Sequence, residues 1–132
     1  MKKLALILIA LVVPGAATAA TTTLHLTEKQ TFAQYVDKGV KGESPGDIRT
    51  FGGNVFLRGM KVGHDRIRCV VAATCDAQVW IGGASLISKG FVARGPNFIA
   101  RITGGTGKYA GARGTVTVVG GPVARYTVRL AG

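Results

Sequence analysis

Apolar and polar residues alternate along most of the chain, and this period of two constrains the fold more than any other feature. Near the C-terminus, Ala124, Tyr126, Val128 and Leu130 alternate with mostly polar neighbours. A β-strand sends successive side chains to opposite faces, so such alternation is typical of a strand with one buried face. We therefore predict strands over these ranges: 21–36 with a bulge, 48–57, 66–69, 76–82, 85–93, 98–103, 115–118 and 123–130.

Turn-forming residues separate these stretches. Glycine accounts for 20 of the 132 residues against only 4 prolines, which argues against long helices. The turn clusters are 43–47, 82–83, 94–97, 104–107 and 120–122. About eight strands with short turns indicate an all-β fold, an eight-stranded antiparallel β-barrel or a sandwich. A closed barrel of this size has room for side chains or one small ligand. The irregular segment 37–45 is expected to be a long, mobile loop at one mouth of the barrel.

An outer-membrane barrel is the competing architecture. It needs a lipid-facing apolar band between two aromatic girdles, and a polar lumen. The aromatic residues of this chain form no such girdles, and the four arginines at positions 66, 68, 125 and 129 would all have to face the lumen. The pattern favours a barrel with a packed interior.

The first residues have the pattern of a secretory signal peptide. Two lysines precede the apolar run 4–13, a Pro-Gly break follows, and Ala17-Thr18-Ala19 is a small-residue cleavage site. The run is too short to span a bilayer as a helix, although a retained anchor is the alternative. We predict that residues 1–19 are removed, that residues 20–132 form a single β-barrel domain without stable membrane insertion, and that this domain is extracellular or periplasmic.

The chain is strongly basic, with a formal net charge of +11 at pH 7. Without Lys2 and Lys3 of the leader, the remaining chain keeps a net charge of +9. Such a balance favours polyanions, among them acidic polysaccharides and anionic lipids. The basic residues are scattered, as on a solvated strand face, and an exported protein seldom meets chromosomal DNA. Nucleic acid is therefore not the expected partner.

The two cysteines, Cys69 and Cys75, are separated by five residues. In an oxidising compartment two such cysteines are expected to form a disulfide, here at the end of a β-hairpin. A reactive thiol or half of a metal site is the alternative, but no Cys-x-x-Cys and no nearby histidine pair supports it.

The glycine-rich segment 102–114 has a superficial likeness to nucleotide-binding motifs. A P-loop needs Ser or Thr after Gly-Lys, and Tyr109 occupies that place. A dinucleotide-binding loop needs a helix to follow, whereas an alternating stretch follows here. We therefore predict a wide turn at 104–107 that binds no nucleotide.

Few side chains suggest catalysis by themselves. Ser85 lacks the surroundings of a nucleophile elbow, and His25 and His64 cannot alone form a zinc site. His25 lies between Leu24 and Leu26. If these leucines face outward, His25 points into the barrel and is an acid or base near neutral pH; otherwise it is solvated.

One segment carries a family resemblance. Residues 102–116, ITGGTGKYAGARGTV, resemble the glycine signature of the allene oxide cyclase and dirigent superfamily. Weaker pieces agree: Pro45-Gly46-Asp47 with Phe51, Val62-Gly63 with Cys69, Gly90-Phe91, and the closing stretch 126–130. Together they cover roughly residues 32–130.

The resemblance implies an eight-stranded antiparallel barrel with a ligand-sized cavity, often in an oligomer. Plant members of the superfamily act on small hydrophobic molecules: cyclases close a fatty-acid epoxide into a ring, and dirigent proteins steer the coupling of radicals. Neither kind needs a metal or an organic cofactor. Both hold a reactive species in one conformation, which is an orientation effect.

The resemblance also suggests site residues. Family cyclases use an inward carboxylate on the first strand, and Glu28 is the only acid in the matching stretch 24–28. Asn54 is the nearest match to an asparagine that holds a water, and the family's barrel cysteine falls on Cys69. The candidate catalytic residues are therefore Glu28, His25 and Asn54. The alternative for Glu28 is a strand end, where it pairs loosely with a surface cation.

These patterns support two functions. The first is a secreted barrel that binds a small hydrophobic ligand, with no cofactor, and acts on it as a cyclase, an isomerase or a stereo-directing protein. The alternative is a non-enzymatic extracellular or envelope module whose basic surface binds acidic glycans. A carboxylate in an apolar cavity favours the first, because burial raises its pKa unless a partner holds it charged.

Overall fold

The alternating stretches fold into one antiparallel sheet in the computed structural model, which describes residues 21–132. The predicted signal peptide lies outside these residues. The strands are β1 (Thr22–Val36), β2 (Ile48–Leu57), β3 (Met60–Val70), β4 (Cys75–Ile81), β5 (Ala84–Phe91), β6 (Asn97–Ile102), β7 (Gly104–Thr106), β8 (Gly114–Val119) and β9 (Ala124–Leu130). A single 3-10 turn, Gly107–Tyr109, follows β7.

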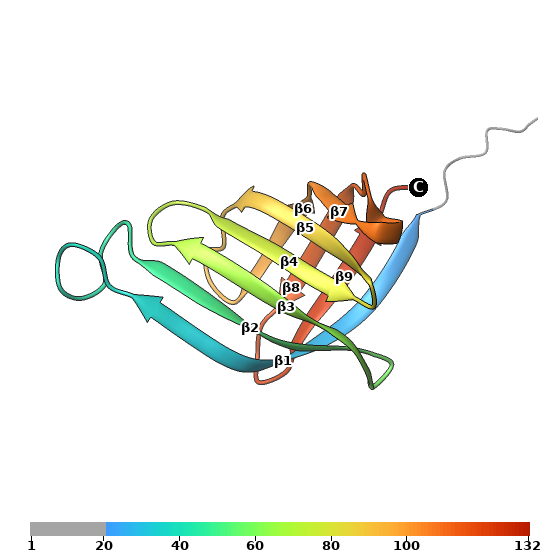
Figure 1. The fold of residues 1–132 in the computed structure, drawn as a ribbon, viewed down its shortest axis with the longest axis horizontal. Helices are drawn as coiled ribbons and strands as arrows, with labels where there is room; N and C mark the ends of the chain where they lie inside the picture. The colour runs from blue at the N-terminus through green and yellow to red at the C-terminus, as the bar shows by residue number, and fades with distance from the viewer. Residues whose placement is uncertain (1–20) are drawn as a thin grey trace, which may run out of the picture.

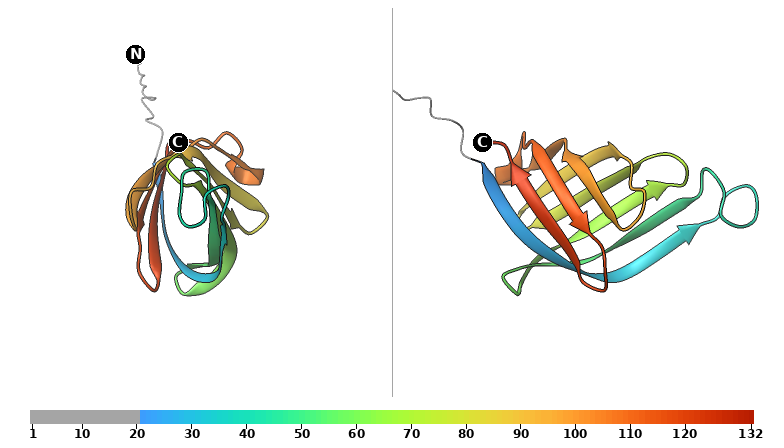
Figure 2. Two further views of the ribbon diagram at one scale, coloured as in Figure 1. Left: turned by 90° about the vertical axis from the view of Figure 1, so that its left-hand side faces the viewer. Right: turned by 180° about the vertical axis from the view of Figure 1, so that it is seen from behind.

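The sheet curls so that its two edge strands, β6 and β7, follow each other in the chain. Its order is β6-β8-β9-β1-β2-β3-β4-β5-β7, and only Thr103 separates the edge strands β6 and β7. The Thr103 N–H donates to the Ile87 carbonyl at 2.8 Å, which ties this junction to β5. The predicted all-β antiparallel barrel is therefore confirmed, with eight chain segments around the ring (Figures 1 and 2).

Strand β7 corrects one prediction. Residues 104–107 are predicted to be a turn, yet Gly104–Thr106 pair with Ile87, Leu86 and Ser85 of β5. A side chain at Gly105 would place its Cβ 2.5 Å from the Ser85 carbonyl oxygen, so only glycine lets the two backbones approach. The turn begins directly after β7, at Gly107, where φ is +62°. Glycine here serves a close contact as well as a turn.

Closure is incomplete along the second half of β5. The β5–β7 ladder covers only Ser85–Ile87, and β6 pairs with β8 on its other side. No ladder therefore joins the end of β5 to the start of β6. This leaves an opening in the wall beside the loop 92–96.

The β1–β2 hairpin extends beyond the rest of the barrel (Figure 1). Both strands match their predicted ranges to within one residue. The predicted bulge lies between Gln30 and Phe32. The connecting loop, expected to be mobile, is held by Asp47, which is fully buried. The Asp47 carboxylate accepts the N–H groups of Lys38 and Ser44 at 2.8 Å, and the Tyr35 hydroxyl donates to it. The hydrogen bond from Tyr35 is the main cause that lowers the pKa of Asp47.

Two clusters of apolar side chains fill the interior. The larger one contains Leu26, Val55, Leu86, Ile102, Val116, Val118, Tyr126, Val128 and Leu130. The smaller one contains Ile67, Cys75, Phe91 and Ala100, close to the disulfide and the incomplete wall. Burial of these side chains supplies the main driving force for the fold.

Cys69 and Cys75 form a disulfide, as predicted. They lie directly opposite each other on β3 and β4, with Cα atoms 4.0 Å apart. The bridge closes the hairpin at its turn, next to the smaller apolar cluster. Both cysteines of the chain are therefore occupied, and the free-thiol alternative does not apply.

Replacing both cysteines with alanine is expected to lower the free energy of unfolding. The bridge closes a loop of seven residues, and the chain-entropy relation gives about 2.4 kcal/mol for a loop of this size. Urea unfolding of the oxidised parent and the double variant measures the difference. An equal midpoint and slope for the two proteins would contradict a stabilising role.

Candidate functional site

Two carboxylic acids are buried inside the barrel. Glu28 on β1 is 6% exposed and Asp65 on β3 is 1% exposed. Each shares the inward face of its strand with an apolar residue two positions away, Leu26 in the first case and Ile67 in the second. The alternation that builds the core therefore also places these acids in it.

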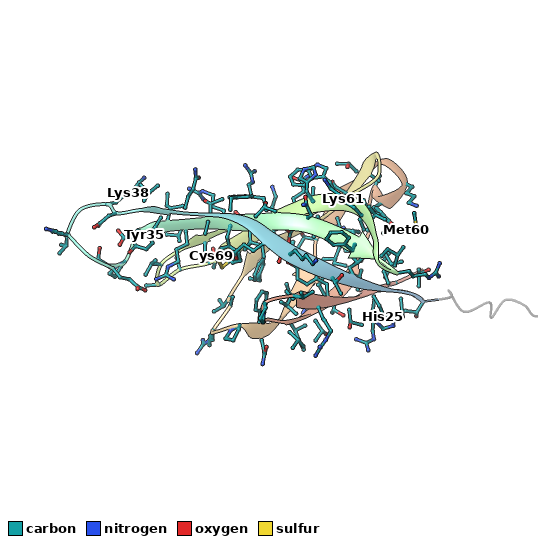
Figure 3. The ribbon with its side chains drawn as sticks, turned by 90° about the horizontal axis from the view of Figure 1, so that it is seen from below. His25, Tyr35, Lys38, Met60, Lys61 and Cys69 are labelled. Atoms are coloured by element: carbon teal, nitrogen blue, oxygen red, sulfur yellow. A yellow bond between two sulfur atoms is a disulfide. The ribbon has the colours of Figure 1, made fainter. Side chains whose placement is uncertain are left out.

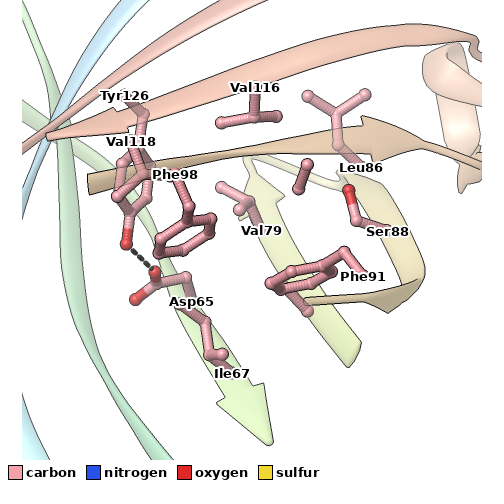
Figure 4. A pocket seen from close by; sticks show the side chains of 12 residues that line it. Asp65, Ile67, Val79, Leu86, Ser88, Phe91, Phe98, Val116, Val118 and Tyr126 are labelled. Carbon is pink, nitrogen blue, oxygen red and sulfur yellow. Dashed lines mark hydrogen bonds between the residues drawn. The ribbon is translucent and has the colours of Figure 1, made fainter. Parts of the chain in front are cut away.

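Asp65 has hydrogen-bond donors for both carboxylate oxygens. The Tyr126 hydroxyl of β9 donates to Oδ2 at 2.5 Å (Figure 4). The Gly53 N–H of β2 donates to Oδ1 at 2.9 Å. Tyr126 is itself 4% exposed. Bonds of this kind favour the charged form of a carboxylate.

Burial favours the neutral form of both acids, and each acid affects the pKa of the other. Burial, then the charge of Asp65 and a hydrogen bond with it, raise the pKa of Glu28 to about 8. Burial also raises the pKa of Asp65, while hydrogen bonds from Tyr126, Glu28 and Gly53 act against that rise. Burial and the nearby Asp65 raise the pKa of Tyr126. With its pKa near 8, Glu28 holds its proton at neutral pH, while the hydrogen bonds to Asp65 favour the charged form of that carboxylate.

This arrangement predicts that stability falls as the pH rises. Because the pKa of Glu28 is about 8 in the folded chain against 4.5 as its ordinary value, only the unfolded state releases the proton between these values. The free energy of unfolding then falls by about 1.4 kcal/mol per pH unit across this window and is level above it. The difference between the parent and Glu28→Gln, from urea unfolding at pH 4 to 9, isolates this slope. A constant difference would contradict the assignment.

A small cavity lies against Asp65. Its volume is about 30 Å³, which is room for a water or two. Its walls are mostly apolar, and its polar groups come from Asp65, Ser88 and Tyr126 (Figure 4). Glu28 does not border the cavity. It contacts any bound molecule only through Asp65.

Phe98 lines both this cavity and a larger groove outside. The outer groove has a volume of about 720 Å³, lies at the mouth formed by the disulfide loop and residues 92–96, and is also lined by Phe98. The Phe98 ring stacks on Phe91, with centroids 5.6 Å apart and an angle of 14° between the planes. Both rings stand where β5 and β6 lack a ladder. In the part of the chain that the structure describes, Phe98 is the one side chain that lines both spaces.

The predicted site residues have different positions. Glu28 points inward from the middle of β1, so its alternative position at a strand end is wrong. His25 is exposed on the outer face, because Leu24 and Leu26 take the inner one (Figure 3). Asn54 lies between Lys29 and His64 in the register, on the outer face, while its neighbour Val55 is fully buried. His25 therefore takes the solvated alternative, and neither His25 nor Asn54, both candidate catalytic residues, faces the interior with Glu28.

The sequence prediction missed Asp65 and Tyr126. A signal for both exists, because Asp65 shares its face with Ile67, and Tyr126 shares its face with Val128 and Leu130. The alternation already places Tyr126 on the buried face of its strand, and extending it from Ile67 by one step places Asp65 in the interior as well. The alternation does not reveal that the two side chains meet.

Within residues 21–132, no three His, Cys, Asp or Glu side chains gather as metal ligands do. In the same part of the chain, no helix is long and apolar enough to cross a membrane.

Comparison with solved structures shows the same fold elsewhere. No protein-family model and no curated protein sequence matches the chain. A pyocyanin demethylase is similar over 83% of this chain and 100% of its own, with 26% identity and a TM-score of 0.74. A pterocarpan synthase dirigent protein is similar over 84% of this chain and 88% of its own, with 13% identity and a TM-score of 0.55. The chain is a dirigent-like barrel in its fold.

A third dirigent-like barrel is a nonspecific heme-binding cyclase that catalyses a cycloaddition during neoabyssomicin biosynthesis. It is similar over 86% of this chain and 67% of its own, with 16% identity and a TM-score of 0.60. The predicted likeness to cyclases and dirigent proteins is confirmed at the level of the fold.

Proposed function

We propose that this dirigent-like barrel binds a flat, hydrophobic small molecule in its interior and moves a proton on it. The observation that carries the proposal is the buried Asp65, which borders an apolar cavity and accepts hydrogen bonds from Tyr126 and Gly53, with Glu28 behind it at a pKa raised to about 8. The similarity to a pyocyanin demethylase over that protein's whole length supports an aromatic ligand, and pyocyanin is the first probe to use. The apolar walls suit such a ring system.

Asp65 is the catalytic residue of this proposal, because it borders the cavity. Its carboxylate accepts a proton from the bound molecule, and the Tyr126 hydroxyl, already bonded to Oδ2, orients it. Glu28 is a positioning residue, because it acts through Asp65. Its proton neutralises half of the pair and keeps the remaining charge on the group that meets the ligand.

Entry of a ligand requires Phe98 to move. The cavity is about 30 Å³, whereas ligand sites are about 300–1,000 Å³ in volume. Rotation of the Phe98 ring away from Phe91 joins the cavity to the outer groove of about 720 Å³. A flat ligand can then occupy the place of the ring and stack on Phe91.

Phe98→Leu is expected to speed the binding of pyocyanin. A smaller, non-stacking side chain removes the barrier at the mouth, so the association rate rises roughly tenfold. Stopped-flow absorbance with excess protein measures the rate. Ile99→Ala is the matched control, because Ile99 lies on the same strand but is 66% exposed on the outside. An unchanged rate in Phe98→Leu, with binding in the parent, would place the entry elsewhere.

We also propose that the barrel is exported and that residues 1–19 are removed on the way. The Cys69–Cys75 disulfide supports an oxidising compartment. Mass spectrometry of the protein from its own host tests this: the chain should begin near Ala20.

A further inference from the structure

The outer face of β3, β4 and β5, the front wall in Figure 1, carries a second set of side chains that the interior site does not use. The register places them in three rows across the strands. The first row pairs His64 with Trp80, the second pairs Arg66 with Gln78, and the third joins Arg68, Asp76 and Lys89. A shallow groove of about 300 Å³ runs over the second and third rows.

The cations in this groove outnumber its one acid, Asp76. Among residues 21–132 the one ion pair joins Arg49 to Glu43, so Arg66, Arg68 and Lys89 have no carboxylate within 4 Å there. All three side chains are exposed. Asp76, the acid of the third row, accepts the Gly90 N–H at 2.9 Å. The groove therefore has a local excess of positive charge.

An aromatic pair stands at the end of this charged groove. The His64 and Trp80 rings stack with centroids 4.6 Å apart and an angle of 16°. On the other side of Trp80, the cross-strand neighbours are the small residues Ser85 and Thr106. The hydroxyl groups of Ser85 and Thr106 form a hydrogen bond, with 2.7 Å between the oxygens. Gln78 also donates to the Ser85 hydroxyl at 2.9 Å, so polar side chains border Trp80 on the side away from His64.

We propose that this outer face binds an acidic polysaccharide. One sugar ring stacks on Trp80, and the acidic groups of the following sugars reach Arg66, Arg68 and Lys89. From the row of Trp80 to the row of Arg68 is four residues along β3, or about 13 Å, the length of a short oligosaccharide. Aromatic faces suit the apolar face of a sugar, and guanidinium groups suit carboxylate and sulfate.

The chemistry separates this partner from other polyanions. A duplex nucleic acid presents phosphates and has no free ring to stack, so it would use the cations but not Trp80. The other basic wall, on β9, has Arg125 and Arg129 at exposed positions, but its cross-strand neighbours Thr27 and Thr23 are not aromatic. Of these two basic faces, only the β3–β5 face combines positive charge with a stacked aromatic ring.

Trp80 is the only tryptophan of the chain, so its fluorescence reports on this face alone. A heparin tetrasaccharide, as the sulfated probe, and an alginate tetrasaccharide, as the uronate probe, are titrated into the whole protein at low and high salt. At least one is expected to change the Trp80 emission saturably, and salt is expected to weaken the binding. A neutral dextran oligosaccharide is expected to cause no change.

Variants decide between specific and general attraction. Arg66→Ala with Arg68→Ala is expected to weaken binding about tenfold, whereas Arg125→Ala with Arg129→Ala removes the same charge and is expected to leave binding nearly unchanged. Near-ultraviolet circular dichroism confirms that both proteins are folded. Equal weakening by both pairs, binding without a Trp80 signal, or tighter binding of duplex DNA than of either oligosaccharide would overturn the proposal.

Discussion

Asp65→Asn is expected to abolish most of the proton-transfer activity that we propose for the barrel. The substitution keeps the shape of the side chain but removes the base, and loss of a positioned base lowers rates by about 10²–10⁴-fold. Binding of the ligand is expected to change far less, because the cavity walls are apolar. The measurement is single-turnover absorbance with pyocyanin, alongside its equilibrium binding.

The control for this variant is Asp37→Asn, which makes the same chemical change in the exposed loop between β1 and β2. Its rate should equal that of the parent. Asp65→Asn with full activity would remove Asp65 from the catalytic role. Loss of binding and activity together, with the fold intact, would make Asp65 a binding residue instead.

Gly53→Ala is expected either to prevent folding or to lower the free energy of unfolding by more than about 4 kcal/mol, which is in the range of the most severe substitutions. A Cβ at this position would lie 1.9 Å from the Lys29 carbonyl oxygen, a backbone atom of the neighbouring strand that cannot move aside. The bulge of β1 begins next to this contact, at Gln30. The same glycine donates its N–H to Asp65, so the substitution also disturbs the acid pair.

Gly83→Ala is the matched control for this effect. Gly83 lies in the β4–β5 turn with open space around an added Cβ and without a positive φ. Its thermal unfolding should be close to that of the parent. A Gly53→Ala protein as stable as Gly83→Ala would show that β1 and β2 can separate without cost.

Much of the fold is predictable from the alternation alone. The range 48–57 coincides with β2, and the long first strand contains its expected bulge. The strand β7 could not be predicted, because three residues of the sequence Gly-Gly-Thr have no strand pattern. Their pairing with β5 depends on the curvature of the whole sheet, which brings the two edges together.

The site was only partly predictable for a similar reason. Alternation fixes which residues share a face but not which face is inside. His25 and Glu28 therefore could not both be inward, since they lie three positions apart on one strand. Packing decides in favour of Glu28, because Leu24 and Leu26 join the core. That Asp65 would meet Glu28 depends on a third strand and on the space left by glycine at position 53.

The barrel is expected to keep a proton on its buried acid pair at neutral pH. Carbon-13 NMR of the side-chain carboxyl groups between pH 3 and pH 10, with Glu28→Gln to assign the signal, measures it directly. The Glu28 carboxyl should titrate near pH 8, as its pKa of about 8 requires. Titration of Glu28 near its ordinary value of 4.5 would contradict the account, because the pair would then carry two negative charges at neutral pH.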